Sequence, residues 1–124
     1  MSEHSGQNLD LTFLYEIADG SNEFIVESIE MFLQHTPALL KEIEDSIAVQ
    51  TWTVAASAAH KLKPNLGFFG MTGSQSLAQE LEFMAKSGNP DINEISSMFK
   101  QLQNSLQGNL EKLDQIKAEA AAQL

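Results

Sequence analysis

The sequence predicts an all-α protein, an antiparallel four-helix bundle with a short extra helix at its N-terminal end. Apolar residues recur at intervals of three and four almost throughout the 124-residue chain, and this is the period of amphipathic helices. Only three prolines and seven glycines interrupt the pattern, and no segment alternates in the manner of a strand. Four long helical segments joined by short turns favour an antiparallel bundle. The length suits one domain, which we place at residues 8–117 between loose termini at 1–7 and 118–124.

The first two helices are predicted at residues 10–18 and 21–49. The short helix is expected to bury apolar residues and to end at Asp19-Gly20, because glycine tolerates the left-handed conformation that closes a helix. Ser21 is a good N-cap for the second helix. Pro37 lies inside that helix and removes one backbone hydrogen bond, so a bend is expected there. The predicted inward residues are Leu11, Leu14 and Tyr15, then Ile25, Ile29, Phe32, Leu40, Ile43 and Ile47.

Three further helices complete the predicted bundle, at residues 51–69, 72–87 and 91–117. Thr72 with Gln75, and Asp91 with Glu94, have the spacing of a capping box. Gly88-Asn89-Pro90 is expected to end the fourth helix, and the alanine-rich tail after Lys117 is expected to fray. The predicted inward residues are Trp52, Ala55, Ala59, Leu62, Leu66 and Phe69, then Leu77, Leu81 and Met84, then Ile92, Ile95, Phe99, Leu102, Leu106, Leu110, Leu113 and Ile116.

Composition excludes several classes of function. Seven lysines and no arginine stand against 17 acidic residues, which gives a formal charge of −10. Such a chain is poorly suited to nucleic acids or anionic membranes, since both need clustered positive charge. The absence of cysteine excludes disulfides and thiol chemistry. No apolar run is long enough to span a bilayer, and the N-terminus does not resemble a signal peptide. We therefore expect a cytoplasmic protein. We also expect a monomer, because the apolar faces of the helices can all pack against one another within one bundle.

Acidic residues are absent from residues 46 through 79, and this gap contains His60, Lys61 and Lys63. The third predicted helix is therefore locally positive in a strongly negative chain. Packed helices with small faces carry few charges in any case, which is the ordinary explanation. The functional interpretation is that a negatively charged group arrives here, held by lysines and not repelled by carboxylates.

His60 is the histidine with the most suggestive neighbours. Its helical neighbours are Ala56, Ser57, Lys63 and Pro64, whereas His4 and His35 are expected to be solvated. An imidazole on an open surface beside a cation suits a phosphoryl acceptor, because neutral imidazole is a good nucleophile near neutral pH. Gly67 and Gly70 follow along the same face, which predicts close approach by another protein's backbone.

Other chemistries lack partner residues in the sequence. Ser57 lies one turn from His60, but no acid is local to complete a catalytic triad. No histidine has the Glu-x-x-His spacing of a di-metal site, and the three histidines have no zinc-site spacing. The sequence also has no glycine-rich phosphate loop for ATP. We therefore predict no metal, no cofactor and no self-sufficient enzyme.

The segment from Ala59 to Gly70, AHKLKPNLGFFG, resembles the phospho-acceptor motif of histidine-containing phosphotransfer (HPt) domains, and the likeness extends over residues 8–117. The matching positions are His60, Leu62, Lys63, Pro64, Gly67 and Gly70. Pro64 departs from the family, where glycine is common at this position. It cannot donate a backbone N–H to the His60 carbonyl, so a local distortion is expected.

The resemblance implies that His60 takes a phosphoryl group from the aspartyl phosphate of a response-regulator receiver domain and passes it to another receiver. The receiver would supply Mg²⁺ and the catalytic groups, and Lys63 and Lys61 would stabilise the phosphoryl group. A hybrid sensor histidine kinase would be a further partner. The expected docking surface is the exposed side of the third helix with parts of the first two, including Ala56, Pro64, Gly67, Phe68 and Gly70. Two alternatives stay open: an adaptor that binds a receiver or kinase domain without chemistry, and an enzyme with His60 as base or metal ligand.

Overall fold

A computed structural model describes residues 9–124 of the chain. It contains five helices, and the described residues include no strand. The predictions for residues 1–7, including a solvated His4, lie outside the described residues. The helices are α1 (Thr12–Ala18), α2 (Asn22–Ala48), α3 (Trp52–Phe68), α4 (Thr72–Lys86) and α5 (Ile92–Ala121).

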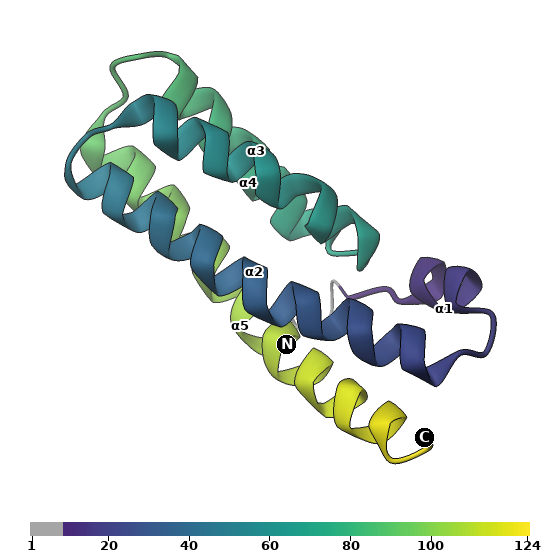
Figure 1. The fold of residues 1–124 in the computed structure, drawn as a ribbon. Helices are drawn as coiled ribbons and strands as arrows, with labels where there is room; N and C mark the ends of the chain where they lie inside the picture. Colours follow the sequence, from purple (N-terminus) through teal and green to yellow (C-terminus); the bar gives the residue numbers. More distant parts are fainter. Residues whose placement is uncertain (1–8) are drawn as a thin grey trace.

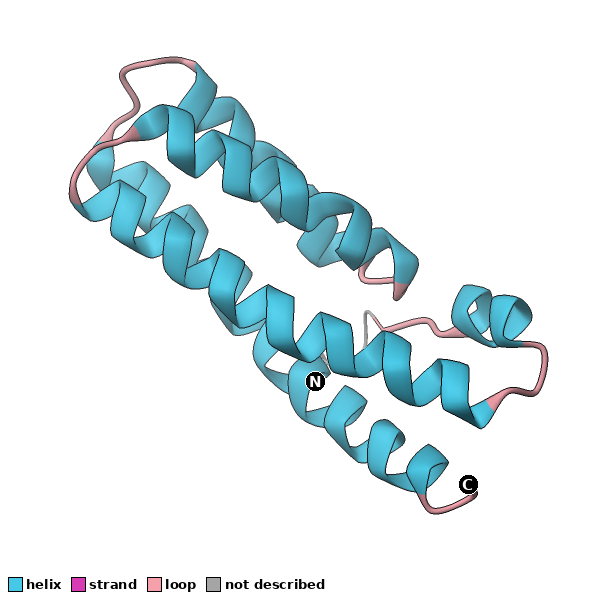
Figure 2. Ribbon diagram, in the orientation of Figure 1, coloured by secondary structure: helices cyan, strands magenta, loops and turns pink. Residues whose placement is uncertain are grey.

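The four long helices form the predicted bundle (Figure 1). Helix α3 packs against α4 and α2 against α5, while α2–α3 and α4–α5 contacts close the bundle. Helices α2 and α5 extend beyond the other two, and α1 lies beside the N-terminal half of α2 at that end (Figure 1). Figure 2 shows that only short turns join the helices. The all-α fold class is therefore confirmed.

Two helix starts are capped as predicted, and a third is not. The Ser21 hydroxyl accepts a hydrogen bond from the Phe24 N–H at 3.1 Å, and Asp91 accepts two bonds from the first turn of α5. The capping box at Thr72 is wrong: Thr72 is the first residue of α4, and Met71 precedes it without a side-chain cap. The side-chain amide of Gln75 instead donates a hydrogen bond to the Lys63 carbonyl of α3 at 3.1 Å.

Helix α5 continues past the predicted end at Lys117 to Ala121. Alanine has the highest helix propensity, and Ala120 is buried against the rest of the molecule. The prediction of a frayed tail from residue 118 is therefore wrong. Helices α2 and α3 also run unbroken through Pro37 and Pro64.

The apolar stripes of α2, α3 and α5 are largely buried as predicted, but the inward face of α4 is rotated. Leu81 is buried, whereas Leu77 and Met84 only pack at the edge of the core. Tyr15, Trp52 and Ile92 are likewise less buried than predicted. The reason lies in the close α3–α4 pair, because closely packed helices bury small side chains in place of large ones. The buried face of α4 consists of Ser74, Ala78, Leu81, Glu82 and Ala85.

Candidate functional site

His60 lies on α3 with its side chain 68% exposed, facing α4. Its Nδ1 atom is 3.0 Å from Oε2 of Glu82, a residue of α4 that is 22 positions further along the chain. The sequence predicted that no acid lies near this histidine, and that prediction is wrong. Helix α4 returns antiparallel to α3 and brings Glu82 back to the level of His60.

Glu82 is the centre of the site, with only 3% of its side chain exposed. Its Oε1 is 2.8 Å from Nζ of Lys63, and its Oε2 is 2.9 Å from Nζ of Lys86. Burial raises the pKa of this carboxyl group, but hydrogen bonds from the two lysines and their positive charges outweigh that effect and lower the pKa to about 2. Glu82 is therefore ionised at neutral pH.

An ionised Glu82 determines the state of the His60 ring. A carboxylate only accepts hydrogen bonds, so the Nδ1 atom that contacts it must carry the proton. In neutral imidazole the other nitrogen then keeps its lone pair. Since Nδ1 points to Glu82, the free Nε2 lies at the opposite edge of a ring that is largely open to solvent.

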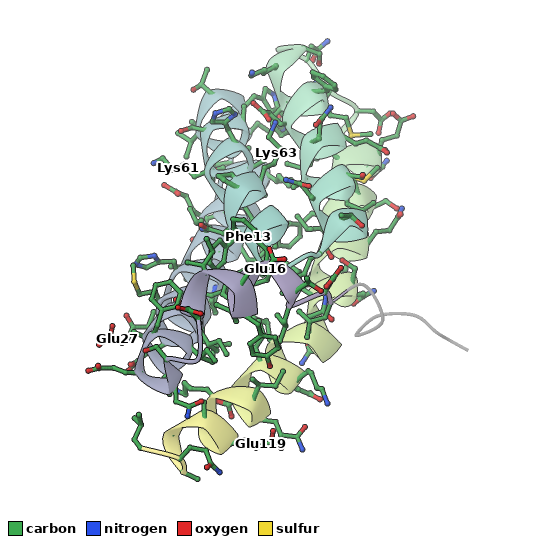
Figure 3. All side chains as sticks on the ribbon, turned by 90° about the vertical axis from the view of Figure 1, so that its right-hand side faces the viewer. Phe13, Glu16, Glu27, Lys61, Lys63 and Glu119 are labelled. Atoms are coloured by element: carbon green, nitrogen blue, oxygen red, sulfur yellow. The ribbon has the colours of Figure 1, made fainter. Side chains whose placement is uncertain are left out.

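The two predicted lysines have different places in this site. Lys63 is mostly buried and bonds Glu82, whereas Lys61 is exposed on the side of α3 away from α4 (Figure 3). Lys86, which the sequence prediction did not include, is the second cation of the network. It lies four residues after Glu82, and a Glu–Lys pair at that spacing was a usable signal. A second usable signal was the position of Glu82 among the small residues of α4.

A groove of about 750 Å³ opens beside His60, between α3 and α4. Trp52, Ala56 and Ala85 line it together with His60 and Glu82. Ala56, predicted as a docking contact, is itself buried. It lines this groove and does not project from the surface.

The two glycines of the motif accommodate parts of this same chain. A Cβ on Gly67 would lie 2.7 Å from Nε2 of Gln75, and that amide donates to the Lys63 carbonyl at 3.1 Å. Gly70 has φ +71°, and a Cβ there would overlap the backbone of Asp10, whose N–H bonds the Phe69 carbonyl at 3.2 Å. Contacts within this chain therefore account for both glycines, and close approach by a partner's backbone is not needed to explain them.

An apolar surface continues from the histidine along α3. Pro64 and Phe68 follow His60 at intervals of four, so they share its helix face. Phe68 contacts Phe13 of α1 edge to face, with ring centroids 5.3 Å apart. Phe13 is 50% exposed and Met31 of α2 is 57% exposed. This set of Pro64, Phe68, Phe13 and Met31 is called the apolar face below.

The alternative chemistries gain little from the geometry. Glu82 supplies an acid beside His60, but within residues 9–124 no hydrogen bond joins Ser57 to the imidazole. The described part of the chain has no group of three or more His, Asp or Glu side chains placed to hold a metal ion. None of its helices combines the length and apolar character needed to cross a membrane.

Comparison with protein families agrees with the helical fold. The Hpt domain family matches residues 27–122, a span that contains His60, Lys63 and Glu82. The chain therefore belongs to the Hpt domain family, whose members are helical bundles that carry phosphoryl groups in signalling and interact with receiver domains. Searches of curated proteins and of solved structures found no match.

Proposed function

We propose that this Hpt protein is a phosphorelay carrier, which accepts a phosphoryl group on Nε2 of His60 from a receiver's aspartyl phosphate and passes it to a second receiver. The observation that supports this most is the 3.0 Å contact of Nδ1 with a buried, ionised Glu82. It leaves the nucleophilic nitrogen of an exposed ring ready to react.

The transfer step follows from this arrangement. The Nε2 lone pair attacks phosphorus, an N–P bond forms, and the bond from phosphorus to the aspartyl oxygen breaks, so that the receiver's carboxylate leaves with the electron pair. Nδ1 keeps its proton, and the ring becomes cationic. The Glu82 carboxylate, 3.0 Å away, stabilises that positive charge, as a carboxylate does for an imidazolium in a catalytic triad.

Glu82 is in this proposal a positioning residue, and the receiver supplies Mg²⁺ and the catalytic groups. Lys63 and Lys86 hold both oxygens of Glu82 and add positive charge close to the phosphoryl group. Lys61, exposed on the outer side of α3, contributes less. Lys63→Ala is therefore expected to slow transfer, through a looser Glu82 as well as through the lost charge.

The apolar face is the proposed docking surface for the receiver. Along α3, Phe68 lies eight residues from His60, about 12 Å at 1.5 Å per residue. A surface that reaches from the histidine to α1 has the dimensions of a small, transient interface. Its exposed aromatic and methionine side chains are of the types that are enriched at interfaces.

The test is phosphoryl transfer from a phosphorylated receiver domain with Mg²⁺, followed by intact mass. The wild-type protein should gain one acid-labile phosphoryl group, and His60→Gln should gain none. His4→Gln is the matched control, since it removes a histidine outside the acceptor motif and outside the proposed docking surface, and it should be labelled like the wild type. Labelling of His60→Gln would overturn the proposal. Stable receiver binding with no phosphoryl transfer to the wild type would instead favour an adaptor.

A further inference from the structure

The charges around the apolar face differ from those on the rest of the surface. Residues 12–40 contain five acidic side chains and no lysine. All five are exposed, and no ion pair within residues 9–124 engages them. They are Glu16, Asp19, Glu23, Glu27 and Glu30.

Elsewhere the exposed acids are mixed with lysines. Lys41 pairs with Asp45 at 3.3 Å on the C-terminal half of α2, and Lys117 lies 4.0 Å from Asp114 on α5. Solubility depends on the net charge and would not by itself explain why acidic residues occur without lysines on one side of the molecule. The unmixed acids are confined to α1 and to the part of α2 that precedes Lys41.

Two of these acids border the apolar face directly. Glu16 lies three residues after Phe13 on α1, and Glu27 lies four residues before Met31 on α2, so each shares a helix face with its apolar neighbour. Figure 3 shows Glu16 beside Phe13 and Glu27 further out on α2, while Lys61 lies toward the other end of the same view. The surface thus changes sign, from negative around α1 and α2 to positive around α3.

The apolar face also contains a small groove between α2 and α3. Its volume is about 180 Å³, and a protein cavity of about 150 Å³ can hold benzene. One aromatic or leucine side chain is therefore a suitable occupant. The groove is lined by Ser28, Met31, Phe32, His35, Asn65, Phe68 and Phe69.

We infer that the cognate receiver inserts one apolar side chain into this groove and surrounds it with basic side chains that face Glu16 and Glu27. The inference rests on the proposed function, because it names the kind of receiver that the same site takes. The change of surface charge orients the receiver in the complex. The receiver's basic groups lie over α1 and α2, and its phosphorylated aspartate lies at the positive end, next to His60. Charges at the rim of an interface act mainly on the association rate and its salt dependence.

The experiment uses several receiver domains, phosphorylated with a small acyl phosphate, whose surfaces around the aspartate range from basic to acidic. Transfer to this protein is measured at low and at high ionic strength. The test variant is Glu16→Lys/Glu27→Lys. The control is Glu42→Lys/Glu44→Lys, which makes the same change in net charge at exposed positions near the other end of α2.

With basic receivers, the test variant should raise the receiver concentration that gives half the maximal transfer rate about tenfold at low salt, leave the maximal rate constant of transfer unchanged, and lose most of this effect at high salt. The control variant should behave like the wild type. Equal behaviour of the two variants, with a wild type that is labelled normally, overturns the charge inference and leaves His60 as acceptor. A wild type that no receiver labels overturns the proposed function, and the inference with it.

Discussion

The two helix pairs of the bundle are built in different ways. Helices α2 and α5 bury large side chains such as Ile43, Leu102 and Leu106. Helices α3 and α4 bury mostly alanine, and they include the buried charge of Glu82. The α2–α5 pair is thus the main apolar support, and the α3–α4 pair is the one that carries the candidate site.

This difference shows why the site lies on α3 and α4. Small side chains let two helices approach closely, and the close approach brings the short Glu82 side chain within 3.0 Å of His60 and 2.8 Å of Lys63. Large side chains between the helices would hold these groups apart.

Leu106→Ala should have the largest effect on stability, and it belongs to the α2–α5 pair. Leu106 is completely buried, and a leucine-to-alanine change at such a site costs about 2 to 5 kcal/mol. The free energy of unfolding, from urea denaturation, measures the loss. Phosphoryl uptake per folded molecule should be unchanged. A fall in uptake with little loss of stability would contradict this division between the pairs.

Glu82→Gln should affect the α3–α4 pair in both stability and reactivity. A pKa of about 2 in the folded protein corresponds to about 3 kcal/mol at pH 7, and glutamine keeps part of the hydrogen bonding, so we expect a loss of about 2 kcal/mol. Phosphoryl uptake should slow because the His60 ring loses its charged partner. Glu80→Gln, an exposed position two residues away on α4, is the control.

The lowered pKa of Glu82 also gives a pH dependence with a defined sign. Because the folded pKa lies below the ordinary value, the stabilisation is present at neutral pH and is lost as the pH falls from about 5 to about 2. Urea denaturation across this range should show a smaller fall in stability for Glu82→Gln than for the wild type. Parallel curves would show that the ion-pair network contributes no stability.

Asn109→Leu should stabilise the protein by about 1 to 2 kcal/mol. Asn109 of α5 is completely buried, and neither polar atom of its amide has a hydrogen-bond partner within the described residues. Leucine is larger but has the same four side-chain heavy atoms with the same branch at Cγ, and it has no polar group to satisfy. Thr36→Val on α2 is a companion test, since the Thr36 hydroxyl is also buried without a partner there. A melting temperature that falls in both variants would contradict this explanation.

Gly67→Ala should have the smallest effect, within about 1 kcal/mol of the wild type. Alanine gains about 1 kcal/mol of helix propensity, but its Cβ displaces the Gln75 amide from the Lys63 carbonyl. Gln75→Ala/Gly67→Ala should therefore be more stable than Gln75→Ala alone. A large loss of receiver binding by Gly67→Ala would instead support the prediction that a partner's backbone approaches this glycine.

Most of the fold could be predicted from the sequence, because the periodic apolar residues of α2, α3 and α5 are the ones that the core buries. The inward face of α4 could not, since a search for large apolar residues selects Leu77 and Met84, whereas close packing selects Ala78 and Ala85. The length of α5 could not be predicted either, because a terminal run of small residues predicts fraying, whereas the high helix propensity of alanine continues the helix to Ala121.

The candidate site could be predicted only in part. The residues local to His60, including Lys63, follow from helical spacing, but Glu82 is 22 positions away and reaches the ring through the α3–α4 packing. The role of Gly67 and Gly70 could not be predicted for the same reason, since it depends on residues that are distant in the sequence. Gln75 and Asp10, which occupy the space beside Gly67 and Gly70, are close only in the folded chain.

The central claim is that Glu82 holds Nδ1 of His60 and leaves Nε2 to carry the phosphoryl group. The most direct measurement is heteronuclear NMR of the phosphorylated protein, with ¹⁵N in the histidine rings and ³¹P in the phosphoryl group. The expected result is a single phosphohistidine, His60, with phosphorus bonded to Nε2 and a proton on Nδ1. Phosphorus on Nδ1, or on another histidine, would contradict it.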